Sequence, residues 1–478
     1  MVIKILYPSS STLISKLGEK YSNKLLHNAQ WSTPCSRKLQ AFMSTSSINT
    51  NGQNFSNNES FDLIVVGGGI VGVTTARAML IEKPNLKVAI LEKEKDVAMH
   101  QSGHNSGVIH AGIYYAPGSM KAKFCVEGAR QTFAFCDLHK IPYKKCGKLI
   151  VATNAFEVGN LMRLYDNALK NRVPGAELVE QKQIRDIEPY CQGLRAIYSP
   201  NTGIIDWAEF TRRCAEDFQR KGGKLFCNFK VTKVNEAEKG SPDVDVSQAP
   251  IEFHDESRGK IVRSKFAIFC GGLYSDKLAE LVDGLPDPRI VPFRGEYLEL
   301  KEDKRFLVKG NIYPVPDARF PFLGVHFTPR MDGRILVGPN AVLAFSREGY
   351  SWDQINSAEL KEIIAFHGFQ KLMREYFNFG VREMIKSKFI SLRVKELQKY
   401  IPGLQTNDLE FKNFTGVRAQ ALDYNGLLVD DMVLQVGSKG IESRILHCRN
   451  APSPSATSSL ALSEFIAKSA IVEFDFDA

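Results

Sequence analysis

Residues 61–92 carry the clearest pattern of apolar and polar positions in the chain. Leu63 to Val66 is a short, uninterrupted apolar run rich in β-branched residues, as expected for a strand that is buried on both faces of a parallel sheet. A glycine-rich turn, a helical stretch and a second apolar run, Val88 to Leu91, follow in that order, and the second run ends at Glu92. This order predicts a strand–turn–helix–strand unit that opens an α/β sheet.

The glycines of the turn have a spacing that suits a phosphate-binding loop. Gly67, Gly69 and Gly72 form a GxGxxG pattern, in which the first permits a tight turn, the second lets a pyrophosphate approach, and the third brings the helix close to the sheet. Glu92 is placed to accept hydrogen bonds from ribose hydroxyls. Because strand, helix and acid agree with the glycines, the unit predicts an adenine dinucleotide site, and the acid favours FAD or NAD over NADP.

Further along the chain, segments with helix and strand patterns are followed by a segment of short strands. A helix beginning at Asp206 and stopping at Gly222 is followed by an apolar strand at 224–231, and a second strand, 265–270, runs directly into Gly271 and Gly272. That junction is another place where backbone can lie against a cofactor. Between 290 and 339, short strands broken by proline and glycine predict an antiparallel sheet.

The later segments complete a two-domain plan. Residues 356–400 are predicted to be helical, and a last helix is predicted at 456–470. The fold class is therefore α/β, with a discontinuous FAD-binding Rossmann-like domain interrupted by an antiparallel-sheet α+β substrate domain. The predicted cofactor-binding parts are 61–145, 206–285 and 411–478, and the predicted substrate-binding parts are 146–205 and 286–410.

Composition and charge exclude several classes of protein. The nine cysteines include no CxxC pair and no His/Cys cluster with metal-ligand spacing, so no metal site is predicted. No uncharged apolar run reaches the ~18 residues of a membrane-spanning helix, so any membrane association is expected to be peripheral. The net charge of +9 includes no arginine-rich block, and nucleic acid is not an expected partner.

Part of that positive charge comes from the first 60 residues. This segment holds six basic and two acidic residues and is rich in Ser and Asn, which is typical of a mitochondrial transit peptide followed by a linker. A disordered tail is the alternative. Import into the mitochondrion is the prediction.

Long stretches of the chain resemble the L-2-hydroxyglutarate dehydrogenases, a family within the FAD-dependent D-amino-acid oxidase/glycine oxidase superfamily. They are HNSGVIHAGIYYAPGSMKAKFC (104–125), VPFRGEYLEL (291–300), YPVPDARFPFLGVHFTPRMDGRILVGPNAVLAF (313–345) and HCRNAPSPSATSSLAL (447–462). The resemblance covers the chain from Phe61 to its end. It implies FAD-dependent oxidation of L-2-hydroxyglutarate to 2-oxoglutarate by hydride transfer from C2 to flavin N5. It also implies a location on the matrix side of the mitochondrial inner membrane, peripheral membrane association, and electron transfer to a non-oxygen membrane acceptor, either a quinone or an electron-transfer flavoprotein.

The resemblance also implies roles for particular residues. The loop from Ser102 to His110 would lie beside the flavin, and the segment TGVRAQ would bring Arg418 to a substrate carboxylate, although Ala419 stands where glycine oxidase has proline. The candidate cofactor contacts are Gly67, Gly69, Gly72, Glu92, Lys93, Ser102, Asn105, Ser106, Gly107, Val231, Gly271, Gly272, Pro452 and Ser453. Because the C-terminal loop would also touch the cofactor, buried FAD is favoured over exchangeable NAD.

Oxidation of a 2-hydroxy acid requires a base and cationic groups for the carboxylate. His110 and His326 are the candidate bases because imidazole has an ordinary pKa of ~6.5, and the sequence leaves open which of them takes the proton. Because a dicarboxylate needs two anion sites, several groups are candidates for binding it. These groups are Arg418, Arg449, Arg294, Arg330 and Tyr297.

The sequence leaves two other interpretations of the function open. The chain could act on a D-amino acid, glycine or glycerol 3-phosphate, as related flavin enzymes do. It could also be a flavoprotein that binds FAD without catalysing a reaction.

Overall fold

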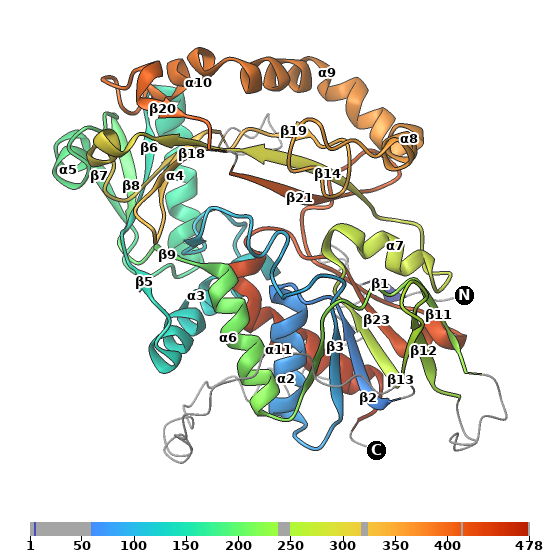
Figure 1. The fold of residues 1–478 in the computed structure, drawn as a ribbon. Coiled ribbons are helices and arrows are strands. Elements are labelled where there is room, and N and C mark those ends of the chain that lie inside the picture. The colour runs from blue at the N-terminus through green and yellow to red at the C-terminus, as the bar shows by residue number, and fades with distance from the viewer. Residues whose placement is uncertain (1–3, 6–58, 238–248, 317–323, 413, 477–478) are drawn as a thin grey trace.

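The computed structural model describes residues 4–5, 59–237, 249–316, 324–412 and 414–476. Figure 1 shows two stacked parts, with a large sheet and its helices below and smaller sheets capped by helices above. The predicted α/β class, with an added antiparallel part, is confirmed. The predicted transit peptide and linker, 1–60, lie almost wholly outside the described residues.

The lower sheet has nine strands, and its centre is parallel. The path runs β1-β22-β23-β13-β2-β3-β10, with β12 pairing with both β11 and β13. The pairs β10–β3, β3–β2, β2–β13 and β13–β23 are parallel. The strands are β1 (Lys4–Ile5), β2 (Ser60–Val66), β3 (Val88–Leu91), β10 (Lys224–Phe226), β11 (Lys233–Glu236), β12 (Ile251–Asp255), β13 (Lys260–Phe269), β22 (Val433–Val436) and β23 (Ile445–Asn450).

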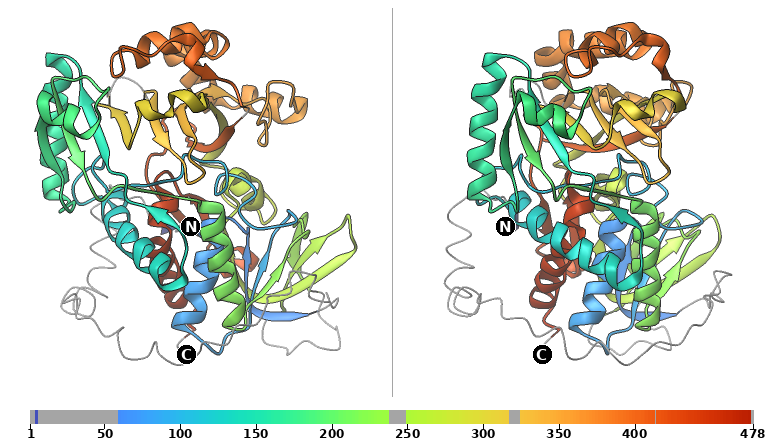
Figure 2. Two further views of the ribbon diagram at one scale, coloured as in Figure 1. Left: turned by 60° about the vertical axis from the view of Figure 1, so that its left-hand side comes forward. Right: turned by 90° about the vertical axis from the view of Figure 1, so that its left-hand side faces the viewer.

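Both faces of the central strands are buried. Leu63, Ile64 and Val65 are 0% exposed, which explains why β2 reads as a continuous apolar run rather than an alternating one. Four helices pack together on one face, as Figures 1 and 2 show. They are α2 (Ile70–Glu82), α3 (Met120–His139), α6 (Trp207–Arg220) and α11 (Ser455–Glu473).

The upper part is built around an eight-stranded sheet in the order β20-β15-β18-β17-β16-β6-β8-β7. All its pairs are antiparallel except β16–β6. The strands are β6 (Lys148–Ala152), β7 (Glu177–Glu180), β8 (Arg195–Ser199), β15 (Leu298–Leu300), β16 (Asn311–Pro314), β17 (His326–Pro329), β18 (Ile335–Gly338) and β20 (Leu409–Glu410).

Two small sheets connect the parts. One has the order β19-β14-β21 and the other β4-β9-β5. Their strands are β14 (Arg289–Glu296), β19 (Val342–Leu343), β21 (Thr415–Leu422), β4 (Val108–Ile109), β5 (Tyr143–Lys144) and β9 (Gly203–Ile205). The other helices are α4 (Ala155–Lys170), α5 (Gln181–Ile187), α7 (Ser275–Glu280), α8 (Ser357–Ala365), α9 (His367–Lys388) and α10 (Ile390–Leu397).

Several local predictions can be compared with these elements. Asp206 caps α6, accepting hydrogen bonds from Ala208 N and Glu209 N. The strand predicted at 224–231 ends early, at Phe226, and Asn228 adopts a φ of 55°, so the chain turns there. The cofactor-binding part predicted to begin at 411 needs correction, because β21 pairs with β14 and the chain rejoins the large sheet only at β22.

No helix among the described residues is both long and apolar enough to cross a membrane.

Candidate active site

The glycine turn after β2 forms the wall of a cleft, and two of its glycines have no room for a side chain. Gly67 has a φ of +117°, and a Cβ there would lie 2.4 Å from Cys270 O. A Cβ on Gly72 would lie 2.0 Å from Gly67 O. The turn, α2 and the end of β13 are therefore in close backbone contact, as the spacing predicts.

The N-terminus of α2 opens on the same cleft. Its first turn contains no acidic residue and no side chain of Gly69 can cap it, so its positive end is available to a phosphate. One of its amides, Ile70 N, donates to Ser102 Oγ over 2.8 Å. Glu92 stands at the end of β3, where its carboxylate accepts from Gly68 N over 2.5 Å and from Glu94 N over 2.8 Å.

The cleft has a volume of about 720 Å³, within the range of cofactor sites. Its glycine wall, helix terminus and acid fit the pyrophosphate and ribose of FAD. The predicted contacts that line it are Gly67, Gly69, Gly72, Glu92, Lys93, Ser102, Val231, Gly271 and Gly272.

Five predicted cofactor contacts do not line this cleft. Asn105 instead holds its own loop, since its amide donates to Gln101 O and Ser102 O and accepts from Gly107 N. Ser106 faces the tyrosines of the upper part. The C-terminal loop contributes Asn450, Ala451, Ser455 and Ala456 to the lining in place of Pro452 and Ser453.

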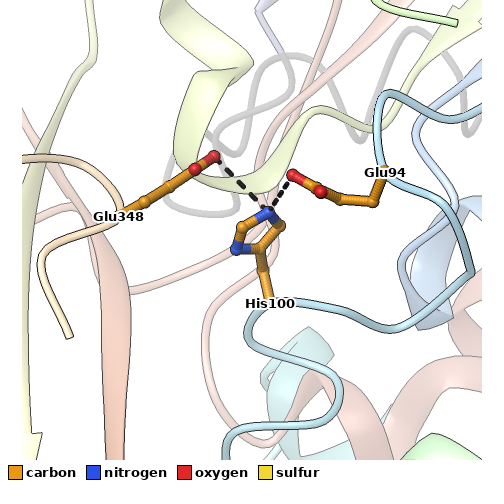
Figure 3. A group of neighbouring side chains, drawn as sticks. All are labelled: Glu94, His100 and Glu348. Carbon is orange, nitrogen blue, oxygen red and sulfur yellow. Dashed lines mark hydrogen bonds and ion pairs between the residues drawn. The ribbon is translucent and has the colours of Figure 1, made fainter. Parts of the chain in front are cut away.

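A charged group closes the rim of the cleft between the two parts. Figure 3 shows His100 between Glu94 and Glu348, and the Lys93 ammonium bonds to both carboxylates and lies 3.0 Å from His100 Nε2. Burial alone would lower the pKa of Lys93, but its hydrogen bonds to Glu348 and Glu94 raise it. The single positive charge of Lys93 offsets one of the two carboxylate charges in this group.

Above the cleft, the structure brings the two predicted histidines into one neighbourhood. His110 N donates to Thr457 Oγ1 over 3.0 Å. Burial, followed by the charge of Lys148 and of His326, holds the pKa of His110 well below its usual range. His326 begins β17 and stacks on Tyr313, with ring centroids 4.0 Å apart.

The tautomer of His326 follows from its partner. Nδ1 lies 3.0 Å from Gly324 O, and a carbonyl oxygen can only accept, so Nδ1 carries the proton and Nε2 presents a lone pair. Burial, the chief cause, and the like charges of Lys148 and Arg418 lower the pKa of His326 to about 3. The ring is therefore neutral near pH 7, with an unprotonated Nε2.

Arg418 is placed where a substrate could reach it. Its side chain is solvent-accessible, yet desolvation by surrounding protein lowers its pKa, an effect that Tyr297 partly opposes. That combination is expected for a side chain lining an internal space. Tyr297 is near both Arg418 and Arg330, and Arg330 Nη1 donates to Asn105 O over 2.7 Å.

Two predicted substrate ligands lie apart from this group and donate hydrogen bonds within the protein, and Arg449 also lines the cofactor cleft. Arg294 is 0% exposed and donates to Glu296 and to two backbone carbonyls. Arg449 donates to Leu285 O, Pro288 O and Gln435 Oε1. We therefore remove Arg294 and Arg449 from the candidate substrate-binding groups.

Sequence reasoning missed Lys148. Its Nζ lies 3.3 Å from His110 Nδ1 and 4.0 Å from the centroid of the Tyr313 ring. In the sequence it reads as the flank of the apolar strand KLIVA, where a lysine normally reaches solvent. Only the tertiary structure shows that it is buried.

Comparison with known proteins agrees with this geometry. A family model described as FAD dependent oxidoreductase matches residues 62–469. L-2-hydroxyglutarate dehydrogenase, mitochondrial, from Homo sapiens is 52% identical over 417 residues, covering 87% of this chain and 90% of that protein. L-2-hydroxyglutarate dehydrogenase from Indibacter alkaliphilus is 42% identical, covering 87% of this chain and 100% of that protein.

Solved structures share the fold at lower identity. L-alpha-glycerophosphate oxidase from Mycoplasma pneumoniae with FAD bound is similar with a TM-score of 0.66 and 21% identity, covering 87% of this chain and 95% of that chain. Glycine oxidase from Geobacillus kaustophilus is similar with a TM-score of 0.60 and 14% identity, covering 86% and 94%.

Proposed function

This chain belongs to the family of FAD-dependent oxidoreductases and, within it, to the L-2-hydroxyglutarate dehydrogenases, and from that premise we propose that it oxidises L-2-hydroxyglutarate to 2-oxoglutarate. The observation that carries the proposal is the hydrogen bond from His326 Nδ1 to Gly324 O, which leaves Nε2 as an acceptor. Arg418 acts on the same histidine and precedes Ala419, which lines the cleft that fits FAD. An alcohol next to a carboxylate needs this pair, a base for the hydroxyl and a cation for the carboxylate.

Each side chain then has a defined task. Bound FAD supplies the acceptor for the hydride. Arg418 holds the carboxylate next to the hydroxyl-bearing carbon, with Tyr297 beside it. His326 takes the hydroxyl proton at Nε2, while its Nδ1–H bond to Gly324 O keeps the ring in position.

Anaerobic titration tests the proposal. The purified holoenzyme is mixed with L-2-hydroxyglutarate, and the visible flavin absorbance is followed. Bleaching by the L form, and none by the D form, is expected because, with the carboxylate at Arg418 and the hydroxyl at His326, only one enantiomer can direct its C2 hydrogen toward FAD. Bleaching by glycine, a D-amino acid or glycerol 3-phosphate, with none by L-2-hydroxyglutarate, would overturn the proposal. No bleaching by any of them would indicate a flavoprotein that is not a dehydrogenase.

We also propose that the enzyme works in mitochondria, docked on the matrix face of the inner membrane, where a non-oxygen acceptor collects its electrons. Animal relatives are named as mitochondrial. An exposed apolar stripe on α9 and α10, the outer helical layer of Figure 1, supports the docking. It comprises Phe377, Val381, Met384, Ile385, Phe389 and Leu392.

The spacing and charge of this stripe suit an anionic lipid surface. The members on α9 have helical spacing (i, i+4, i+7 and i+8), which places Phe377, Val381, Met384 and Ile385 on one helical face. Phe389 lies in the extended link between α9 and α10. Phe377 is 57% exposed and Phe389 58%. Exposed basic residues, including Arg382 and Lys395, lie on the same helices, as in helices that lie at membrane interfaces.

Replacing Phe377 and Phe389 together by serine is expected to weaken binding to vesicles about 100-fold, since burying each ring contributes about 1.5–3 kcal/mol. Co-sedimentation with phosphatidylcholine vesicles, with and without cardiolipin, measures the effect. Phe306→Ser is the matched control, because Phe306 is 56% exposed but lies outside the stripe. Equal binding by all three proteins would remove the stripe from the docking surface.

A further inference from the structure

Lys148 is a buried amine for which the described part of the chain offers no acidic partner. It opens β6, is 2% exposed, and its Nζ lies against His110 Nδ1 and over the rings of Tyr313 and Tyr114. No carboxylate among the described residues forms an ion pair with it or shifts its pKa. A buried charge of this kind is costly, because it has lost its hydration without gaining a counter-ion.

The groups facing Lys148 relieve that cost only in part, because two aromatic faces attract its charge but supply no counter-ion. Burial lowers its pKa to about 7, and its own charge lowers the pKa of both His110 and His326. The titratable groups around it are imidazoles, phenols and thiols. They are His110, His326, Tyr114, Tyr313, Cys125 and Cys146. The surroundings favour the arrival of an anion.

The position of that anion follows from His326. Two cations lower the pKa of this histidine. They are Lys148, from the eight-stranded sheet, and Arg418, from the sheet β19-β14-β21. The Tyr313 ring contacts both groups, with its centroid 4.0 Å from Lys148 Nζ and 4.0 Å from the centroid of the His326 ring. An anion that reaches Lys148 is therefore close to His326 and to a group bound to Arg418. With Arg294 and Arg449 committed elsewhere, Lys148 is the additional cation beside His326.

We propose that Lys148 binds the second carboxylate of the substrate, the one remote from the hydroxyl, and thereby selects a dicarboxylate. This inference rests on the proposed function, in which Arg418 binds the first carboxylate. Bound carboxylate keeps Lys148 charged, and the ammonium then donates to His110 Nδ1. His110 must accordingly carry its proton on Nε2 and act as a donor, which leaves His326 as the base.

A pair of substrates tests the selection. L-2-hydroxypentanoate has the same chain as L-2-hydroxyglutarate, with a methyl group in place of the remote carboxylate. The ratio of kcat/KM for the dicarboxylate to kcat/KM for the monocarboxylate is expected to fall about 100-fold in Lys148→Met, as for removal of one partner of a buried charge pair. Lys148→Arg, which keeps the charge, should retain most of the ratio. Lys144→Met is the matched control, since Lys144 is exposed on the preceding strand.

Two further readouts separate this role from an indirect one. Wild-type kcat/KM for L-2-hydroxyglutarate should decline as pH rises through about 7, where Lys148 loses its charge, because kcat/KM reports groups of the free enzyme. The decline should be absent with L-2-hydroxypentanoate and shifted to higher pH in Lys148→Arg. An equal fall in kcat/KM for both substrates in Lys148→Met would show that Lys148 acts only by positioning His110, and would overturn the proposal.

Product binding keeps this test independent of turnover. The oxidised holoenzyme is titrated with 2-oxoglutarate and with 2-oxopentanoate, and the perturbation of the flavin spectrum gives each Kd. Lys148→Met should weaken the binding of 2-oxoglutarate more than that of 2-oxopentanoate, with FAD content unchanged. A failure of the proposed function would appear as wild-type flavin that L-2-hydroxyglutarate does not bleach. A failure of the Lys148 assignment would appear as unchanged 2-oxoglutarate affinity in the variant.

Discussion

Replacing Arg418 by alanine is expected to lower kcat/KM for L-2-hydroxyglutarate about 1,000-fold, or ~4 kcal/mol, because a buried carboxylate loses its charged partner. Arg418 projects from β21 into a desolvated space beside His326 and Tyr297, where a charge-assisted, bidentate contact is strong. FAD should stay bound, since Arg418 is not among the residues that line the cofactor cleft. Steady-state kinetics and the flavin content of the purified variant measure the two effects.

Two control variants separate the effect of the planar pair of guanidinium donors from the effect of the positive charge. Arg418→Lys keeps the charge but loses the planar pair of donors, so its activity should lie between wild type and alanine. Arg382→Ala removes an exposed arginine from α9 and should leave kcat/KM unchanged. Loss of FAD from Arg418→Ala, or kcat/KM within a factor of a few of wild type, would show that Arg418 does not hold the substrate.

Local patterns predicted the glycine turn and the acid of the cofactor half of the site. The strand, the GxGxxG turn and Glu92 lie within one continuous segment, so their geometry depends on neighbouring residues. The structure accordingly places Gly67, Gly72 and Glu92 around one cleft. The junction at Gly271 and Gly272 could be predicted in the same way, because β13 runs directly into it.

The substrate half depends on contacts between distant segments, and patterns predicted it less well. Arg294 and Arg418 were both candidate substrate ligands, and the resemblance favoured Arg418; the structure shows that Glu296 and backbone carbonyls accept the hydrogen bonds of Arg294. Lys148 looked like the polar end of a strand, and only packing against Tyr313 and His110 buries it. The sequence also left the choice of base open, whereas the hydrogen bond from His326 Nδ1 to Gly324 O favours His326.

Removal of His326 is expected to slow flavin reduction by L-2-hydroxyglutarate about 1,000-fold, the size of effect that a positioned general base contributes. His326→Asn is the conservative variant, because its amide can still donate to Gly324 O while no lone pair stands at the Nε2 position. The rate constant of flavin reduction, measured in anaerobic single turnovers, is the readout. KM should change far less, since Arg418 remains to bind the carboxylate.

The pH dependence and chemical rescue distinguish a base from a structural residue. With a pKa of about 3, His326 is neutral above that value, so its protonation should produce no loss of wild-type kcat/KM near the ordinary imidazole pKa. In His326→Asn the remaining base is hydroxide, and the slow reduction should rise with pH. Added imidazole should accelerate flavin reduction in His326→Ala but not in His110→Ala, because His110 acts as a hydrogen-bond donor. Rescue of His110→Ala alone would reverse the two assignments, making His110 the group that takes the hydroxyl proton.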